Sequence, residues 1–202
     1  DSLQSGTFNG KHVSECARGS YCAVYEIKES PDLVLKAYHG KIDEGFSESA
    51  LLKLMKNSLQ NYRDIAALSL PVAELVNLNT AVSQGFFRQK KIPHEFDFQN
   101  PLHVLQAQKF FSLSIEKKVA MDLQPQNLRV TGENKLVLID FIEEEDSIDT
   151  FITKACRAWV DLARAKGFSK EAGRDLLQTL TSSFLDKHDI FTSAWLTEIV
   201  GD

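Results

Sequence analysis

Two short runs in the first third of the chain combine β-branched, aromatic and alternating polar residues. They are "SYCAVYEI" at 20–27 and "DLVLKAY" at 32–38, and the intervening "KESPD" is typical of a turn. Further on, "FSESALLKLMKNSLQNY" at 46–62 has apolar side chains at helical spacing, with Ser47 as a candidate N-cap. The pattern therefore predicts two strands followed by a helix.

The rest of the chain changes from strand-like to helical patterns. Residues 72–92 are expected to form two strands around Asn77–Thr80, and the polar connection from Pro93 to Pro101 predicts a boundary between lobes. Beyond it we expect a helix over 101–120, a hairpin with a turn at 132–134, two amphipathic helices and a short terminal helix. The predicted fold class is α+β, with a β-rich small lobe at 1–93 and a mostly helical lobe at 94–202.

Composition narrows the function classes. The chain has 202 residues, enough for one large domain or two small lobes, and a net charge of −5, which argues against a nucleic-acid partner. No apolar run approaches the roughly 20 residues that span a bilayer, so no membrane association is expected. The three cysteines lack metal-ligand spacing, which favours free thiols in a reducing compartment. Since the sequence begins at Asp1 and not at methionine, we expect that a preceding segment has been removed.

The stretch "MDLQPQNLRVTGENKLVLIDF" at 121–141 contains the candidate chemistry. Asp122 and Asn127 are five residues apart, and Asp140 ends the second strand of the predicted hairpin. Folding of the hairpin would return Asp140 to the neighbourhood of Asn127, and carboxylate and amide oxygens suit magnesium. In isolation, Asp122 and Asn127 are also common loop formers around Pro125.

The first lobe adds a second set of candidates. Gly19-Ser20 precedes an alternating strand, Lys36 ends the run "LVLK", and Glu48 opens the predicted helix. Each also has a plainer interpretation. Gly19 could be a simple turn glycine, Lys36 a charge on a strand edge, and Glu48 a solvated charge in the first turn of a helix. Glu44 is a rival to Glu48 as a partner for the lysine.

Taken in order, these elements resemble the protein-kinase-like fold from about Ala17 to Phe141. The resemblance implies a minimal bilobal fold that uses ATP and Mg²⁺ to transfer the γ-phosphate to serine or threonine. Lys36, held by Glu48, would then clamp phosphates, and Gly19 and Ser20 would cover them with backbone N–H groups.

The same resemblance assigns the remaining roles. Asp122 and Asn127 match D-x-x-x-x-N of the kinase catalytic loop, and Asp140 matches the start of D-F-G. Asp122 would orient the attacking hydroxyl and accept its proton, while Asn127 and Asp140 would ligate magnesium. Lys90 and Ile92, in "FFRQKKIP", would present backbone groups to adenine.

The chain departs from ordinary kinases in ways that point to a smaller class. Ala120-Met121 replaces the histidine-arginine pair, Ile142 replaces the glycine of D-F-G, and no A-P-E motif follows. The chain therefore resembles the minimal effector kinases that bacterial type III secretion systems inject into host cells. Two kinds remain open: one phosphorylates the ninety-kilodalton heat-shock chaperone, and the other binds ubiquitin-charged conjugating enzymes and dampens innate immune signalling.

This resemblance implies a monomer that acts on a host protein in host cytoplasm. Two alternatives stand beside it. A pseudokinase would keep the nucleotide pocket and act by binding a partner. A small-molecule phosphotransferase would be expected to have a larger helical lobe than this chain provides.

Overall fold

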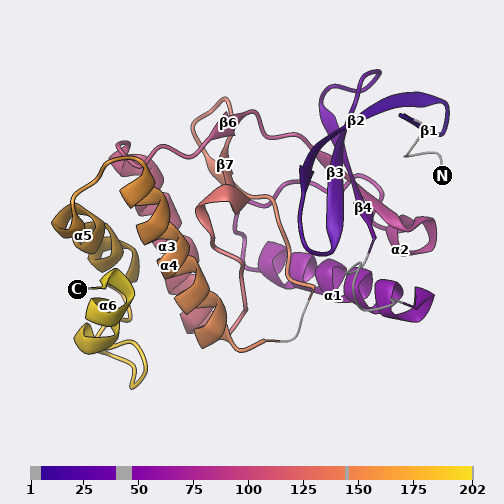
Figure 1. Ribbon diagram of the computed structural model, residues 1–202. Coiled ribbons are helices and arrows are strands. Elements are labelled where there is room, and N and C mark those ends of the chain that lie inside the picture. Colours follow the sequence, from indigo (N-terminus) through magenta and orange to yellow (C-terminus); the bar gives the residue numbers. More distant parts are fainter. Residues whose placement is uncertain (1–5, 40–46, 144–145, 202) are drawn as a thin grey trace. The chain divides into compact units, whose positions relative to one another are not determined.

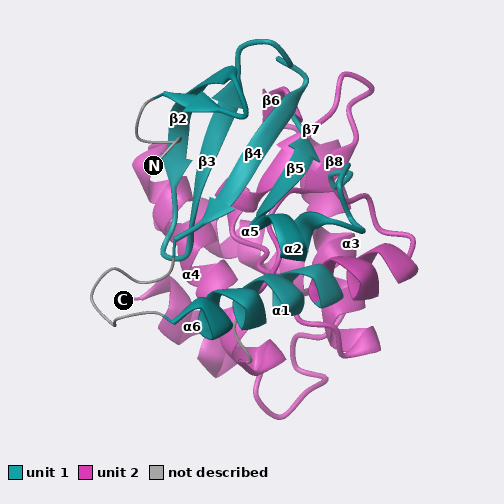
Figure 2. Cartoon of the chain, turned by 90° about the vertical axis from the view of Figure 1, so that its right-hand side faces the viewer, with its two compact units in different colours: residues 1–60, 73–91 teal, residues 61–72, 92–202 magenta. Residues whose placement is uncertain are grey.

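The computed structural model describes residues 6–39, 47–143 and 146–201. The chain divides into two compact units, residues 1–60 with 73–91 and residues 61–72 with 92–202 (Figure 2). The sequence analysis places one boundary after residue 93, whereas the chain changes unit after residues 60, 72 and 91.

The first unit contains an antiparallel sheet in which the strands follow chain order (Figure 1). Its described strands are β1 (Thr7–Phe8), β2 (Lys11–Arg18), β3 (Cys22–Ile27), β4 (Leu33–Tyr38) and β5 (Phe86–Lys90). One face of this sheet buries an apolar cluster that includes Ala23, Tyr25, Leu35 and Phe86. The predicted strands at 20–27 and 32–38 are confirmed.

A two-residue turn joins β1 to β2. Thr7 pairs with His12 and Phe8 with Lys11, and the intervening Asn9 and Gly10 have φ angles of 49° and 75°. Positive φ at both central positions defines the turn that matches the twist of a hairpin, and Asn-Gly is its strongest sequence signal. Residues 7–12 therefore form a hairpin in addition to the strands predicted at 20–27 and 32–38.

Two glycines in the hairpins of this sheet should respond differently to alanine. Gly10→Ala is expected to lower the free energy of unfolding by about 1–2 kcal/mol, because φ is +75° although the space around the Cβ position is open. Gly19 has no positive φ, and an added Cβ would lie 3.6 Å from the Cys22 carbonyl oxygen, an ordinary contact. Gly19→Ala should therefore leave stability unchanged or raise it by up to about 1 kcal/mol. Urea denaturation of both variants measures the difference, and equal losses would contradict it.

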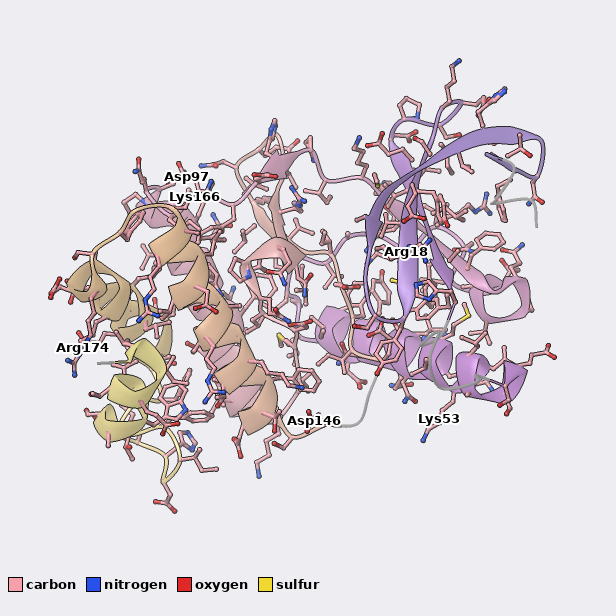
Figure 3. All side chains as sticks on the ribbon, viewed as in Figure 1. Arg18, Lys53, Asp97, Asp146, Lys166 and Arg174 are labelled. Carbon is pink, nitrogen blue, oxygen red and sulfur yellow. The ribbon has the colours of Figure 1, made fainter. Side chains whose placement is uncertain are left out.

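Helix α1 (Glu48–Ala67) confirms the predicted helix and extends it by five residues beyond Tyr62. The Ser47 hydroxyl accepts a hydrogen bond from the Ala50 N–H at 3.3 Å, as expected of an N-cap. Apolar side chains at helical spacing, Leu54, Met55 and Leu59, are buried. Lys53 lies on the outer side of the helix and is exposed (Figure 3).

The prediction of two strands around Asn77–Thr80 is only half right. The second strand is β5, but the first is reduced to two isolated bridges, Val72 with Leu138 and Leu75 with Gln89, and a short helix α2 (Ala81–Gln84) precedes β5. The buried side chain of Asn77 is the physical reason. Its Nδ2 donates to the Phe86 carbonyl at 3.0 Å and its Oδ1 accepts from the Arg88 N–H at 2.7 Å, so it satisfies backbone groups that a strand would have paired.

The second unit is mostly helical. Its described elements are β6 (His94–Glu95), α3 (Pro101–Lys117), the 3₁₀ turn η1 (Pro125–Asn127), β7 (Leu128–Val130), β8 (Leu136–Leu138), α4 (Ile148–Ala165), α5 (Lys170–Thr181) and α6 (Ser193–Val200). Helix α3 packs on α5, and α4 packs on α5 and α6. The predicted hairpin, amphipathic helices and terminal helix are confirmed, and Ser169 caps α5 through a bond from the Ala172 N–H.

The core of this second unit is built around Trp159 of α4. Its side chain is completely buried and makes edge-to-face contacts with Phe96 and Phe98, at centroid distances of 4.7 and 5.2 Å. Trp195 is half-buried and packs on Phe191.

Two expectations from composition can be compared with the structure. Cys16 is exposed, whereas Cys22 and Cys156 are buried, and all three are free thiols. Within the described ranges, no helix combines the length and apolarity that crossing a membrane requires.

Candidate active site

Lys36 lies in the middle of the first unit's sheet, not at its edge. Strand β4 is flanked by β3 and β5, and Lys36 pairs with Val24 on one side and Phe87 on the other. Only 6% of its surface is exposed. The interpretation of Lys36 as a solvated strand-edge charge is therefore excluded.

The register also shows which side chains share the face of Lys36. Directly paired residues of antiparallel strands project to the same face, as do residues two apart in one strand. Val24 and Val34 are half-buried on this face, and Gln89, which pairs with Val34, is 2% exposed. This face thus combines a cation, aliphatic side chains and one buried amide.

The positions of Glu48 and of the Gly19-Ser20 turn do not distinguish the kinase-like roles from the plainer interpretations. Glu48 is the first residue of α1 and is exposed, as a solvated first-turn charge would be, and Glu44 lies outside the described residues. Gly19 and Ser20 are exposed at the turn between β2 and β3, as predicted for the hairpin. The Gly19 N–H donates to the Cys22 carbonyl at 2.8 Å, so binding a phosphate through it would require that bond to open.

The residues predicted to contact adenine lie at the end of β5. The Lys90 N–H donates to the Glu74 carbonyl at 2.9 Å, which leaves that group engaged within the first unit. Ile92 follows, is half-buried and belongs to the second unit. The hinge role of both residues stays a prediction.

In the second unit, an extended segment leads from α3 to the 3₁₀ turn and presents Asp122. Met121, Leu123 and Pro125 are buried, whereas Asp122 and Gln124 between them are half-buried. The Trp159 indole N–H donates to the Leu123 carbonyl at 2.8 Å and so anchors the segment beside Asp122. Met121 thus fills a core position that an arginine could occupy only by burying its charge.

The Asp122 carboxylate is held by an ordered pair of amides. Gln124 Nε2 donates to both carboxylate oxygens, at 3.0 and 3.3 Å, and Gln126 Nε2 donates to Gln124 Oε1 at 2.9 Å. The second bond fixes which end of the Gln124 amide faces Asp122. Burial raises the pKa of Asp122 above its usual range, the hydrogen bonds from Gln124 oppose this rise, and the Asp140 charge adds to it.

The hairpin returns Asp140 to Asn127, as the sequence predicts. Leu128 pairs with Leu138, and the Ile139 N–H donates to the Asn127 carbonyl at 2.9 Å, immediately before Asp140. Asn127 is 8% exposed, and its Nδ2 donates to the Asp122 carbonyl oxygen at 3.3 Å. The structure therefore brings Asp122, Asn127 and Asp140 together, which a chance run of loop formers would not explain.

The donor chemistry of this cluster fits magnesium. Donation by Nδ2 turns the Asn127 Oδ1 away from the Asp122 carbonyl, and Asp140 supplies a half-buried carboxylate. Mg²⁺ typically takes one or two protein oxygen ligands and completes its shell with water and substrate phosphates. The described residues contain no group of three or more His, Cys, Asp or Glu side chains arranged to hold a metal.

Two residues of this region were not singled out by the sequence. Gln124 could have been predicted from the sequence, because residues two apart in an extended segment project to the same side and Gln124 lies two residues after Asp122. Asn61, on α1, hydrogen-bonds to Ala120, before Asp122 in the chain, and to Ile142, after Asp140. No sequence motif predicts these contacts.

The described elements form a β-rich first unit and a mostly helical second unit, which confirms the predicted α+β class, and their order is the one expected of a minimal protein-kinase-like fold. An antiparallel sheet has helices α1 and α2 between its last two strands, and it is followed by helix α3, the loop that contains Asp122, and a hairpin that leads to Asp140-Phe141. No protein-family model matches the chain, and no curated protein matches it. Among solved structures, the chain is similar to an apo pseudokinase, with 11% identity, a TM-score of 0.49, and coverage of 93% of this chain and 90% of that one.

Proposed function

We propose that this protein is a magnesium- and ATP-dependent protein kinase that transfers the γ-phosphate to a serine or threonine hydroxyl. The observation that supports this most is the convergence of Asp122, Asn127 and Asp140 in the second unit, where Asn127 donates to the Asp122 carbonyl and accepts from the Ile139 N–H next to Asp140. Phosphoryl transfer needs little covalent chemistry from the protein, so a few well-positioned charges suffice.

Each residue has a distinct role in this proposal. Asp122 orients the substrate hydroxyl and accepts its proton, and Gln124 holds its carboxylate. Asn127 and Asp140 hold Mg²⁺, which when bound neutralises charge on the phosphates.

In the first unit, Lys36 contacts phosphate oxygens and is paired with Glu48, while Ser20 and Gly19 cover the phosphates. The aliphatic side chains of Val24 and Val34, on the face of Lys36, suit the flat apolar surface of adenine. Lys90 and Ile92 contact the base through the backbone.

The biological setting follows from the sequence resemblance. We propose an effector that is secreted into a host cell, acts in host cytoplasm as a monomer, and phosphorylates a host protein such as a chaperone or a component of the ubiquitin pathway. Helix α4 begins at Ile148, only eight residues after Asp140, with Ser147 as its N-cap. Any regulatory segment between Asp140 and α4 would therefore be short.

Nucleotide binding gives the first test. Mg-ATP at millimolar concentration is expected to raise the melting temperature, because a ligand that binds only the folded state stabilises it by about 2.7 kcal/mol at a hundred times its Kd. For a chain of this size that corresponds to a shift of roughly 5–10 °C. Differential scanning fluorimetry measures it, with ATP and EDTA in a parallel sample.

The control is Asp140→Asn, which keeps the side-chain shape but removes the charge. It should abolish the magnesium-dependent part of the shift and leave the rest. An unchanged melting curve for the wild-type protein in Mg-ATP would contradict the proposed function. A shift without phosphate transfer to any protein of a host lysate would favour the pseudokinase alternative.

A further inference from the structure

One side chain of helix α1 is hydrogen-bonded to both catalytic segments of the second unit. Asn61 Nδ2 donates to the Ala120 carbonyl oxygen at 2.8 Å, and Asn61 Oδ1 accepts from the Ile142 N–H at 3.0 Å. We propose that Asn61 is a positioning residue for the reaction, which fixes the segment of Asp122 relative to the segment of Asp140. This inference rests on the proposed function, and it assigns to α1 a part in the catalytic geometry.

The two hydrogen bonds of Asn61 can fix both segments because each bond lies close in sequence to one of the two aspartates. Ala120 lies two residues before Asp122, and Ile142 lies two residues after Asp140. The two segments are already joined by the hydrogen bond from the Ile139 N–H to the Asn127 carbonyl. Asn61 adds a second connection, through Ala120 and Ile142, so each segment is held at two points.

Asn61 binds the backbone of Ala120 and Ile142, not their side chains. Ala120 and Ile142 have no side-chain hydrogen-bonding group, and a single amide that offers both a donor and an acceptor satisfies one backbone group in each segment. Serine or threonine at position 61 would be too short to bridge them, and a carboxylate would lack the donor.

A second contact from the same turn of α1 supports the assignment. The ring of Tyr62, the next residue, packs edge-to-face against Phe141 with centroids 5.1 Å apart. Asparagine is a poor helix former, yet Asn61 lies well inside α1, where propensity alone would favour another residue. The two long-range bonds give a reason for its presence there.

The test compares Asn61→Leu, Asn61→Asp and the control Arg63→Leu, which introduces the same leucine at an exposed position of α1. Leucine at 61 removes both hydrogen bonds while keeping a similar volume. Aspartate keeps the acceptor for the Ile142 N–H and loses the donor to Ala120. For each variant, kcat, KM for ATP, circular dichroism and amide hydrogen exchange of ¹⁵N-labelled protein are measured.

We expect Asn61→Leu to lower kcat by about a hundredfold with little change in KM for ATP, since misplacing catalytic groups by an ångström has effects of that size. Exchange of the Ile142 amide should accelerate, whereas the Ile139 amide, bonded to Asn127, should stay protected. Asn61→Asp should keep Ile142 protected and still lose activity, and Arg63→Leu should match the wild type. Should the leucine variant not fold, the aspartate variant decides by the same measurements.

The inference is overturned if a folded Asn61→Leu or Asn61→Asp protein has the kcat of the Arg63→Leu control. It is also overturned if activity falls while exchange accelerates equally at Ile139 and Ile142, since that would indicate a general loss of stability. Failure of the proposed function is recognised separately, because the wild-type protein would then transfer no phosphate. The exchange data would still show whether Asn61 connects the two segments.

Discussion

Asp122→Asn is expected to lower kcat by about 10²–10⁴-fold, the usual contribution of a positioned general base. The amide cannot accept the proton of the substrate hydroxyl, although it keeps the shape of the carboxylate. Because burial raises the pKa of Asp122, the ionised carboxylate lowers the stability of the folded protein relative to the unfolded chain. The neutral variant should therefore have an equal or higher melting temperature.

The expected combination of lost activity and retained stability separates a catalytic role from a structural one. Asp161→Asn, which neutralises an exposed acid on α4, is the matched control and should keep wild-type activity. Steady-state kinetics with Mg-ATP and thermal denaturation provide both measurements. Full activity of Asp122→Asn, or a lower melting temperature together with lost activity, would contradict the role assigned to this carboxylate.

Trp159→Ala is expected to lower the free energy of unfolding by about 3–5 kcal/mol, the usual result of emptying a buried aromatic site. The indole is completely buried among Phe96, Phe98 and Phe111. For a protein of this size the loss corresponds to roughly 6–20 °C in melting temperature. Denaturant titration measures the change.

Phenylalanine at the two tryptophan positions isolates the hydrogen bond. Trp159→Phe leaves the Leu123 carbonyl without its donor and should cost about 1–3 kcal/mol beyond the loss of volume. Trp195 offers the contrast, because its buried Nε1 has no hydrogen-bond partner in the described part of the chain. Trp195→Phe should therefore have a much smaller effect, and equal losses at the two positions would refute this interpretation. Since Leu123 is adjacent to Asp122, only Trp159→Phe should also lower kcat.

Local patterns predicted the regular elements well, because their information is contained in neighbouring residues. The strands at 20–27 and 32–38 follow from alternation, and the N-cap Ser47 was correctly identified as a hydroxyl residue preceding an apolar helical pattern. The cluster of Asp122, Asn127 and Asp140 was also predictable, because a hairpin of known length fixes which residues meet.

What the sequence could not supply depends on contacts between distant residues. Asn77 replaces a strand by a helical turn through bonds to Phe86 and Arg88, nine and eleven residues away. Asn61 bonds to residues 59 and 81 positions further along the chain. An isolated asparagine in a helical pattern gives no sign of such partners. The Asn9-Gly10 turn was different, since its signal is local and was overlooked.

The division of α1 between the two units has a consequence for dissecting the protein. The chain passes from one unit to the other after residues 60, 72 and 91, so neither unit is a continuous segment of the gene. A truncation after residue 93 would leave residues 61–72 attached to the first unit and remove from the second the helical turn that carries Asn61. Separate expression of residues 94–202 should thus yield a fragment that lacks part of its own core, and partial proteolysis should release no stable catalytic half. Any exchange of modules with a related protein would have to respect three junctions at once, which favours inheritance of the whole chain as one piece.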